Sequence, residues 1–367
     1  MEKRGNDHKK SALSVSEGVN QPDSINKRAV DKLKKAKKNL PSTEELFLGL
    51  REGNISMLGQ AITLVESSLD QHQKGAQDLV SACLPHSGKS FRVGITGVPG
   101  AGKSTFIEAL GKHIIHQGGK LAVLAIDPSS ERSKGSILGD KTRMEELAAN
   151  PSAFIRPSPT GGTLGGVARK TRETIILCEA AGFDTLFIET VGVGQSETAV
   201  HGMVDFFLLI MLAGAGDELQ GIKRGIMEMA DAIVINKADG NNIQKARRAQ
   251  AEFINALHLF PPSASGWTPL VKTCSSLHNK GIDEIWDMAK DFYALVSQKG
   301  YLDLRRQEQS RFWMHETIRD GIYNQVFNDP RMKVELQEHE KAMAEGRMTS
   351  FMAAVSILNK YKSYDKS

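Results

Sequence analysis

Residues 97–104 read Gly97-Val98-Pro99-Gly100-Ala101-Gly102-Lys103-Ser104, and Thr105 follows them. Glycines at this spacing let the backbone curl so that several N–H groups converge on phosphate oxygens. A strand-like apolar run, 91–96, precedes the stretch, and an apolar helical face follows it. That helix directs its positive dipole end at the phosphates, Lys103 reaches the β and γ oxygens, and the Ser104 hydroxyl binds Mg²⁺. Residues 97–105 therefore predict a loop that binds the phosphates of a nucleoside triphosphate.

Outward from this loop, short apolar runs alternate with helical patterns. We predict strands at Phe91–Thr96, Leu121–Asp127, Thr185–Thr190, Phe206–Leu212, Ala232–Asn236 and Leu270–Ser275. We predict helices at Lys103–Gln117, Gly166–Ala181, Glu218–Ala230, Ile243–His258 and Asp283–Ser297. Near-continuous apolar strands separated by helices are typical of an α/β fold, a doubly wound and mostly parallel sheet with helices on both faces. We assign this domain to residues 89–299.

The segments on either side of this domain lack strand patterns. Residues 1–40 are polar with a basic run, which predicts a disordered, solvated tail. Residues 41–88 predict a helical lead-in, with Ser42 and Glu45 spaced as a capping box. Residues 300–367 predict a helical arm that packs on the domain or serves oligomerisation. Its expected helices are Leu304–Phe327, ended by Asp329-Pro330, then Lys333–Glu345 and Thr349–Tyr361.

The composition excludes several classes of protein. A net charge of +4 is too small for a committed nucleic-acid binder. No apolar run reaches the roughly 20 residues of a membrane span. The first residues include acids and lack the apolar core of a signal peptide. The three cysteines lie far apart, without a metal-binding pair or a disulfide framework. We expect a cytoplasmic protein in a reducing compartment.

A second motif indicates which base is bound. Asn236-Lys237-Ala238-Asp239 follows the run 232–235, about 130 residues after the phosphate loop. A carboxylate at Asp239 accepts from guanine N1–H and the 2-amino group together, whereas adenine N1 is itself an acceptor. Cys274-Ser275-Ser276-Leu277 follows the last predicted strand, where backbone N–H groups would meet guanine O6. We expect GTP and GDP as the nucleotides, with the base bound by Asn236, Lys237, Asp239, Ser275, Ser276 and Leu277.

Three acidic residues, Asp127, Asp140 and Glu189, lie at or after predicted strand ends. Ligands of open α/β sheets lie at the carboxyl ends of the strands, which places two of these acids near the phosphates. Mg²⁺ prefers oxygen ligands and keeps several waters. The candidate magnesium ligands are therefore Ser104, Asp127, Asp140 and Glu189, although each acid alone also fits a surface residue or a helix cap. The glycine-rich stretches 160–166 and 213–217 fit tight turns, and also switch loops that sense the γ-phosphate.

Taken together, these motifs resemble those of the MeaB/ArgK GTPases. The resemblance covers about residues 42–360 and is carried by Gly-Val-Pro-Gly-Ala-Gly-Lys-Ser, Asp-Pro-Ser-Ser, Gly-Asp-Lys-Thr-Arg-Met, Glu-Thr-Val-Gly-Val-Gly-Gln-Ser-Glu and Asn-Lys-Ala-Asp. It implies a homodimeric, magnesium-dependent GTPase that is a chaperone for an adenosylcobalamin-dependent acyl-CoA mutase. In this family the client is methylmalonyl-CoA mutase or a related mutase, and the chaperone gates cofactor loading and protects or reactivates the enzyme.

The resemblance also implies roles for single residues. Asp127, Asp140 and Glu189 would serve Mg²⁺ and the water that attacks the γ-phosphate. Gly192 would lie in the second switch, and Asp217 to Lys223 would form a third switch whose Lys223 the partner brings to the active site. Catalysis would then rest on Lys103, Glu189, Asp217 and Lys223, and the helices from Leu304 onward would form the dimerisation arm.

One feature departs from Ras-type GTPases. Gln195 stands three residues after Gly192 instead of directly after it, so Gln195 cannot be assigned the water-positioning role of the Ras glutamine. The sequence also shows no obvious arginine finger. We therefore expect slow intrinsic hydrolysis that rises when the partner binds.

Four alternatives fit the motifs less well. A nickel metallochaperone GTPase needs a Cys/His cluster, and here only His113 and His116 are neighbours on a helix. A signal-recognition GTPase usually has Thr in place of Asn236. An amino-acid-transport-related kinase needs a second substrate pocket that no motif indicates. A binding module with GTP as a structural ligand would not need acids near the γ-phosphate.

Overall fold

The computed structural model describes residues 41–126, 144–157, 164–190, 196–213 and 224–364. Their core is one seven-stranded sheet in the order β3-β2-β4-β1-β5-β6-β7, and every neighbouring pair is parallel. The strands are β1 (Phe91–Gly97), β2 (Leu121–Ile126), β3 (Ala153–Arg156), β4 (Thr185–Thr190), β5 (Phe206–Leu212), β6 (Ala232–Asn236) and β7 (Leu270–Thr273). The predicted α/β fold is confirmed.

Strand β3 is the one strand of the described chain that the sequence did not predict. It has four residues, Ala-Phe-Ile-Arg, at the edge of the sheet. A run this short carries too few alternations to separate a strand from a turn of helix. It pairs with β2 in the register Leu121↔Ala153 to Leu124↔Arg156.

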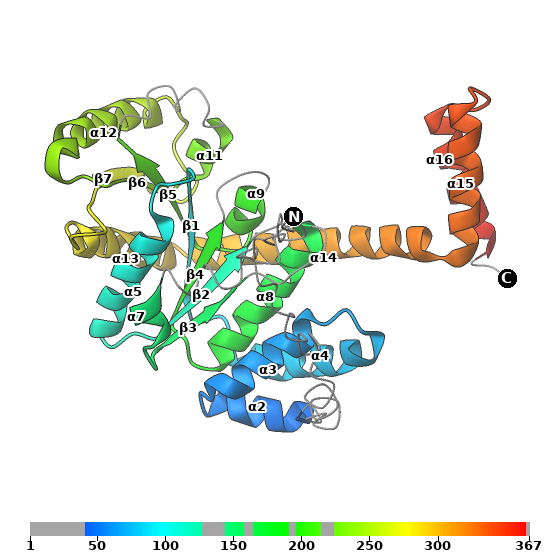
Figure 1. Cartoon of the computed structure of the whole chain (residues 1–367), viewed down its shortest axis with the longest axis horizontal. Coiled ribbons are helices and arrows are strands. Elements are labelled where there is room, and N and C mark those ends of the chain that lie inside the picture. The colour runs from blue at the N-terminus through cyan, green and yellow to red at the C-terminus, as the bar shows by residue number, and fades with distance from the viewer. Residues whose placement is uncertain (1–40, 127–143, 158–163, 191–195, 214–223, 365–367) are drawn as a thin grey trace, which may run out of the picture. The chain divides into compact units, whose positions relative to one another are not determined.

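Helices cover both faces of the sheet (Figure 1). One face packs against α5 (Lys103–His116), α7 (Glu145–Ala148) and α13 (Ile282–Gln298). The other packs against α8 (Leu164–Ala180), α9 (Ser196–His201), α11 (Arg224–Met229) and α12 (Ile243–Leu257). Strand alternation assigns the side chains: Leu208 and Ile210 join the first cluster, whereas Leu209 and Met211 join the second face.

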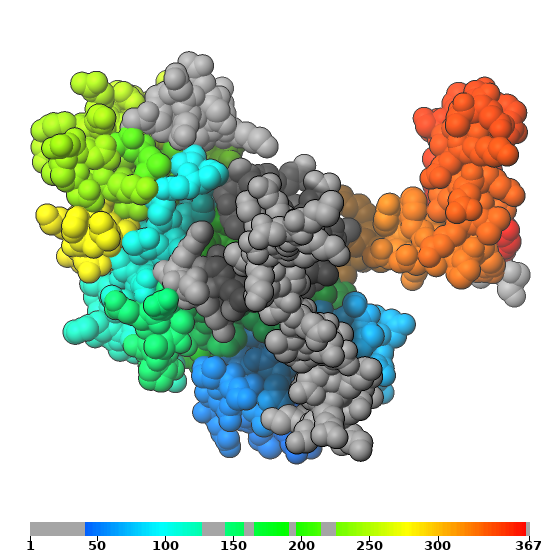
Figure 2. Space-filling model, viewed as in Figure 1, coloured from blue at the N-terminus to red at the C-terminus, as the bar shows by residue number. Residues whose placement is uncertain are grey.

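The lead-in consists of α2 (Thr43–Arg51), α3 (Ile55–Glu66), α4 (Asp70–Cys83) and the 3₁₀ turn η1 (Leu84–His86). Leu46, Leu58 and Leu79 bury their side chains in the cluster that α8 shares. The predicted capping box is confirmed: Glu45 N donates to Ser42 Oγ (3.2 Å) and Ser42 N donates to the Glu45 carboxylate (2.7 Å). These helices are blue in the space-filling view of Figure 2.

The C-terminal helices are α14 (Tyr301–Asn328), α15 (Pro330–Ala344) and α16 (Ser350–Tyr364). The sequence placed the start of α15 at Lys333, but the helix begins at Pro330. Proline ends one helix and suits the first turn of the next, where its missing N–H is not needed. The Asp329 carboxylate caps the new helix by accepting from Arg331 N at 2.7 Å.

In the part of the chain that the structure describes, no helix combines the length and apolar character needed to cross a bilayer. The cytoplasmic location stays a prediction. The basic tail, residues 1–40, lies outside the described residues.

Candidate nucleotide site

The phosphate loop joins the end of β1 to the start of α5. Gly100 and Gly102 have positive φ angles, 78° and 85°, and Gly102 caps α5 in the left-handed region. Gly97 lies against the neighbouring strand: a Cβ at this position would meet Ile210 O at 2.1 Å. Because that neighbour is backbone, no side-chain movement relieves the clash. The glycine pattern read from the sequence is thus required by this backbone path.

Lys103 extends its side chain back over the loop. Its Nζ donates to Gly97 O at 2.9 Å and to Val98 O at 3.4 Å, and the residue is buried. Burial lowers the pKa of Lys103 from its ordinary value, and the carboxylates of Glu189 and Glu197 partly offset that effect. The ammonium is therefore held at the end of β1 by two carbonyl oxygens of its own loop.

Asn236, at the end of β6, ties the phosphate loop to the segment after β7. Its amide nitrogen donates to Ala101 O at 2.9 Å. Its amide oxygen accepts from Ser276 N (3.1 Å) and Ser276 Oγ (2.8 Å). All these groups are buried, so the geometry of one motif depends on the other. This bond also explains the tight packing at Gly102, where a Cβ would meet the Asn236 amide at 2.9 Å.

Asp239 lies beside the segment after β7. Ser275 Oγ donates to an Asp239 carboxylate oxygen at 2.5 Å, which fixes the orientation of that carboxylate. Lys237, between Asn236 and Asp239, adopts a positive φ of 58° and is exposed. Leu277 is also exposed, at 74%. The structure thus brings together the loop at 97–102 and the two segments predicted to hold guanine.

The described oxygen donors near the loop suit Mg²⁺. Glu189 is a buried carboxylate at the end of β4, and Ser104 lies in the first turn of α5. Thr190 donates to Thr96 (2.8 Å), which links the ends of β4 and β1. Among the described residues, no three His, Cys, Asp or Glu side chains form a metal cluster. Mg²⁺ commonly takes one or two protein oxygens together with phosphates and water, so this donor set fits it.

Five predicted site residues lie outside the described residues. They are Asp127, Asp140, Gly192, Asp217 and Lys223. In the sequence each follows β2, β4 or β5, whose carboxyl ends lie at the same edge as the phosphate loop. Their roles stay predictions.

The sequence reasoning missed Glu197. It lies in the first turn of α9 and is only 3% exposed. Its place in Gly-Gln-Ser-Glu, one of the motifs that carry the family resemblance, was the available signal. Nothing else in the sequence around Glu197 indicates that its carboxylate is buried or acts on Lys103.

A family model and curated relatives match most of this chain. The family model described as "Methylmalonyl Co-A mutase-associated GTPase MeaB" matches residues 58–331. The "GTPase ArgK" of Escherichia coli (strain K12) is 50% identical over 289 residues, 79% of this chain and 87% of that protein. The "Methylmalonic aciduria type A homolog, mitochondrial" of Mus musculus is 46% identical over 330 residues, 87% of this chain and 80% of that protein.

One further relative and one solved structure agree in length and fold. A "Probable GTPase" of Mycobacterium tuberculosis (strain ATCC 25618 / H37Rv) is 50% identical over 317 residues, 86% of this chain and 94% of that protein. The crystal structure of an LAO/AO transport system kinase matches with a TM-score of 0.71 and 38% identity, over 87% of this chain and 97% of that chain.

Proposed function

Since the chain belongs to the MeaB family of methylmalonyl Co-A mutase-associated GTPases, we propose that it is a magnesium-dependent chaperone of an adenosylcobalamin-dependent acyl-CoA mutase. The Mycobacterium tuberculosis and Escherichia coli relatives are both named as GTPases, which supports hydrolysis of GTP as the activity. Methylmalonyl-CoA mutase is the first candidate client, because the family description names that enzyme. The proposed role is to gate cofactor loading and to protect or reactivate the mutase in the cytoplasm.

The hydrogen bonds of the Asn236 side chain are the main support for nucleotide binding at this site. By bonding Ala101 O and the Ser276 backbone together, this side chain sets the phosphate loop and the guanine segments at a fixed separation. We assign the base to Asp239 and the 275–277 segment, and the phosphates to Lys103 and the loop amides. With the base held between these segments, the Asp239 carboxylate favours guanine over adenine.

Chemistry at the γ-phosphate would use the acids of this edge. When bound, Mg²⁺ would neutralise phosphate charge, held by Ser104, Asp127, Asp140 and Glu189. Glu189, at the end of β4, is proposed to orient the attacking water, and Lys103 to stabilise charge that develops on the phosphate oxygens. Asp217 and Lys223 are proposed to complete the site when the mutase binds.

Glu189→Gln tests the enzymatic part. We expect GTP binding to stay within about threefold of wild type, because the substitution is isosteric, and hydrolysis to fall by about a hundredfold. Single-turnover hydrolysis and equilibrium binding measure the two effects separately. Loss of binding in parallel with hydrolysis would assign Glu189 to the fold instead. Transfer of phosphate from GTP to arginine, in place of water, would favour the kinase alternative.

Copurification tests the chaperone part. The full chain is mixed with methylmalonyl-CoA mutase and with an isobutyryl-CoA-type mutase, each with and without a non-hydrolysable GTP analogue. We expect one mutase to bind in a nucleotide-dependent way and to raise the rate of GTP hydrolysis. Binding to neither would remove the chaperone role and leave the GTPase activity standing. An intrinsic rate as fast as the stimulated rate would also contradict the proposal.

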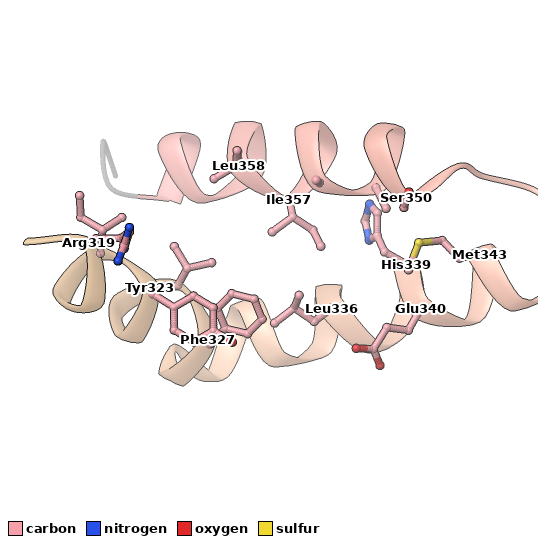
Figure 3. Close-up of a pocket in the computed structure, with 14 residues that line it drawn as sticks. Arg319, Tyr323, Phe327, Leu336, His339, Glu340, Met343, Ser350, Ile357 and Leu358 are labelled. Carbon is pink, nitrogen blue, oxygen red and sulfur yellow. The ribbon is translucent and has the colours of Figure 1, made fainter. Parts of the chain in front are cut away.

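A groove between α14, α15 and α16 supports the proposed homodimer (Figure 3). It encloses about 540 Å³. Its wall is mostly apolar and includes Tyr323, Phe327, Leu336, Met343, Ile357 and Leu358. Large apolar side chains nearby are left half or more exposed, among them Ile318, Ile322 and Phe351. An apolar patch of this kind on a soluble chain marks an interface, and we propose that a second copy of the same arm covers it.

Charge in the groove tests the dimer. Leu358→Glu places a carboxylate in the groove wall, and we expect it to convert the dimer to a monomer in light scattering. Leu259→Glu is the matched control, since Leu259 is 79% exposed in a segment outside the arm. A monomeric wild type, or a dimer that survives Leu358→Glu, would rule out this interface.

A further inference from the structure

A cavity of about 690 Å³ lies at the amino ends of β5, β6 and β7, at the opposite end of these strands from the phosphate loop. The ends of α9 and α11, the loop after α12 and the first turns of α14 meet there. None of the described residues assigned to the nucleotide lines it. Its volume is within the range of roughly 300–1,000 Å³ that is typical of small-molecule sites.

A nearly buried cation, Arg305 of α14, faces this cavity. Its side chain is only 11% exposed. Its Nη2 donates to His201 Nε2 at 3.2 Å, whereas its Nη1 lies 3.6 Å from Asp231 Oδ2, which is longer than a hydrogen bond. An arginine has five N–H donors. Within the part of the chain that the structure describes, most of the Arg305 donors therefore have no close acceptor.

The two groups beside Arg305 are held by other contacts. Asp231 Oδ2 accepts from Phe207 N at 2.8 Å, which keeps this carboxylate from closing on the guanidinium. The ring of His201 packs edge-on against Phe207, with the ring centroids 5.5 Å apart. Burial, and then the charge of Arg305, lowers the pKa of His201 to about 4, so its imidazole is neutral at pH 7. The local structure therefore leaves the charge of Arg305 only partly compensated.

Arg306, the next residue of α14, is bonded differently. Its Nε and Nη2 donate to the Asp205 carboxylate at 2.8 and 2.6 Å, and Nη2 also donates to Ser90 O at 2.7 Å. Arg306 thus has the two-point pairing with a carboxylate that guanidinium geometry favours. Arg305 lacks such a partner within the described chain and keeps donors that a carboxylate from outside can take.

Apolar side chains form another part of the cavity wall, among them Leu257, Phe260 and Trp267. The indole of Trp267 is held in place: its Nε1 donates to Asp231 O at 2.9 Å, and its ring packs edge-on against Phe292 at 5.5 Å. A fixed aromatic wall beside a guanidinium suits a ligand that is apolar at one end and anionic at the other.

We propose that this cavity binds a small organic carboxylate with an apolar or aromatic body. The carboxylate takes the available donors of Arg305, and the body packs against Phe260 and Trp267. Two acids, Asp231 and Glu228, line the same cavity and disfavour ligands of higher negative charge, such as phosphate esters. The cavity is separate from the nucleotide site, so its occupancy does not depend on the proposed GTPase function.

Three probes test this site in the full chain. 3-Phenylpropionate carries the carboxylate and the aromatic body, 3-phenylpropionamide lacks the charge, and acetate lacks the body. We expect 3-phenylpropionate to shift the indole N–H resonance of Trp267 in NMR spectra and to bind about tenfold more tightly than either of the others, because hydrogen bonds to a charged acceptor are the stronger ones. Equal affinity for the acid and the amide, or no shift with the acid at millimolar concentration, would overturn the proposal.

Variants locate the probe. Arg305→Gln should weaken 3-phenylpropionate about tenfold and leave the amide unchanged. The matched control is Arg156→Gln, which removes a partly buried arginine paired with Glu66 at the β3 edge of the sheet and should bind the acid as wild type does. Thr268→Trp, which fills the cavity from an exposed residue of its wall and leaves Arg305 in place, should weaken both probes. Wild-type affinity for the acid in Arg305→Gln or in Thr268→Trp would contradict binding in this cavity.

Discussion

Buried acids lie at both ends of the parallel strands, at the amino ends (the amino edge) and at the carboxyl ends (the carboxyl edge). The charges of these acids are compensated in different ways at the two edges. At the amino edge, Asp205 is 1% exposed and accepts from Arg306 Nε (2.8 Å), Arg306 Nη2 (2.6 Å) and Arg92 N (2.9 Å). Glu179 is paired with Arg92 at 2.8 Å. At the carboxyl edge, Glu197 is 3% exposed and its Oε2 has no hydrogen-bond partner in the described chain, while Lys103 bonds its own loop. Arginine side chains pair with the acids of the amino edge, whereas the acid of the carboxyl edge has no arginine partner among the described residues.

The choice of cation explains the difference. The planar guanidinium of Arg306 bonds Asp205 at two nitrogens and also reaches Ser90 O at 2.7 Å, so it fixes α14 to the sheet. A lysine is a compact point charge on a flexible stem and can leave one partner for another. Acids paired with arginine stabilise the fold, whereas Lys103, which donates to carbonyl oxygens of its own loop, can turn to a phosphate.

The largest expected effect is at the amino edge. Asp205→Asn leaves Arg306 buried without its counter-charge, and we expect the free energy of unfolding to fall by about 3–5 kcal/mol. At the carboxyl edge, Glu197→Gln should leave the free energy of unfolding unchanged or raise it, because the substitution removes a buried charge that is costly to desolvate. Urea unfolding of the two nucleotide-free variants measures both. Equal losses of unfolding free energy in the two variants would contradict the difference between the two edges.

A second prediction concerns two buried groups at the amino edge that share Arg305. Burial, then Arg305, lowers the pKa of His201 to about 4. Burial raises the pKa of Asp231 to about 6, although Arg305 (3.6 Å) and Phe207 N (2.8 Å) favour its charged form. In the wild type these two effects oppose each other over the same pH range, so single variants should uncover each one.

In Asp231→Asn only His201 remains. The unfolded chain protonates it below about 6.5 and the folded chain only below about 4, so stability should fall as the pH is lowered across that range. In His201→Gln, folded Asp231 keeps its proton up to about pH 6 but the unfolded chain only to about 3.8, so stability should fall as the pH rises. Each change in the free energy of unfolding across this pH range is about 3 kcal/mol. Urea unfolding over this pH range should therefore give slopes of opposite sign; parallel slopes would be inconsistent with the assignment.

The smallest effect is expected at an exposed pair. Lys112 and Glu146 form an ion pair between α5 and α7, with side chains 42% and 73% exposed. Glu146→Gln should change the free energy of unfolding by less than about 1 kcal/mol, because water already compensates these charges. A loss as large as that of Asp205→Asn would mean that burial is not what separates the two classes of pair.

The sequence predicted the fold and the phosphate loop well for a physical reason. The glycines at 97, 100 and 102 encode a backbone path, and the apolar strands encode a sheet covered on both sides. The segments predicted to bind guanine could be placed at this end of the sheet because Asn236 and Asp239 follow a buried strand in a recognisable order. In each case local spacing determines the geometry, so one sequence is sufficient to read it.

Contacts between distant segments could not be read in this way. Arg306 reaches Asp205 and Ser90 across more than a hundred residues of sequence, and nothing near Arg306 indicates that partner. Glu197 favours the charged form of Lys103 although α9 and α5 lie on opposite faces of the sheet. Both depend on packing, which the alternation of apolar residues predicts only as faces and not as pairs.

Guanine is proposed to bind between Asp239 and the 275–277 segment. Xanthine carries a carbonyl where guanine carries its 2-amino group, so an amide at position 239 suits xanthine and a carboxylate suits guanine. The most direct test is kcat/KM of wild type and Asp239→Asn for GTP and XTP. We predict that Asp239→Asn loses about a hundredfold with GTP and becomes selective for XTP. An unchanged preference for GTP in that variant would contradict the claim.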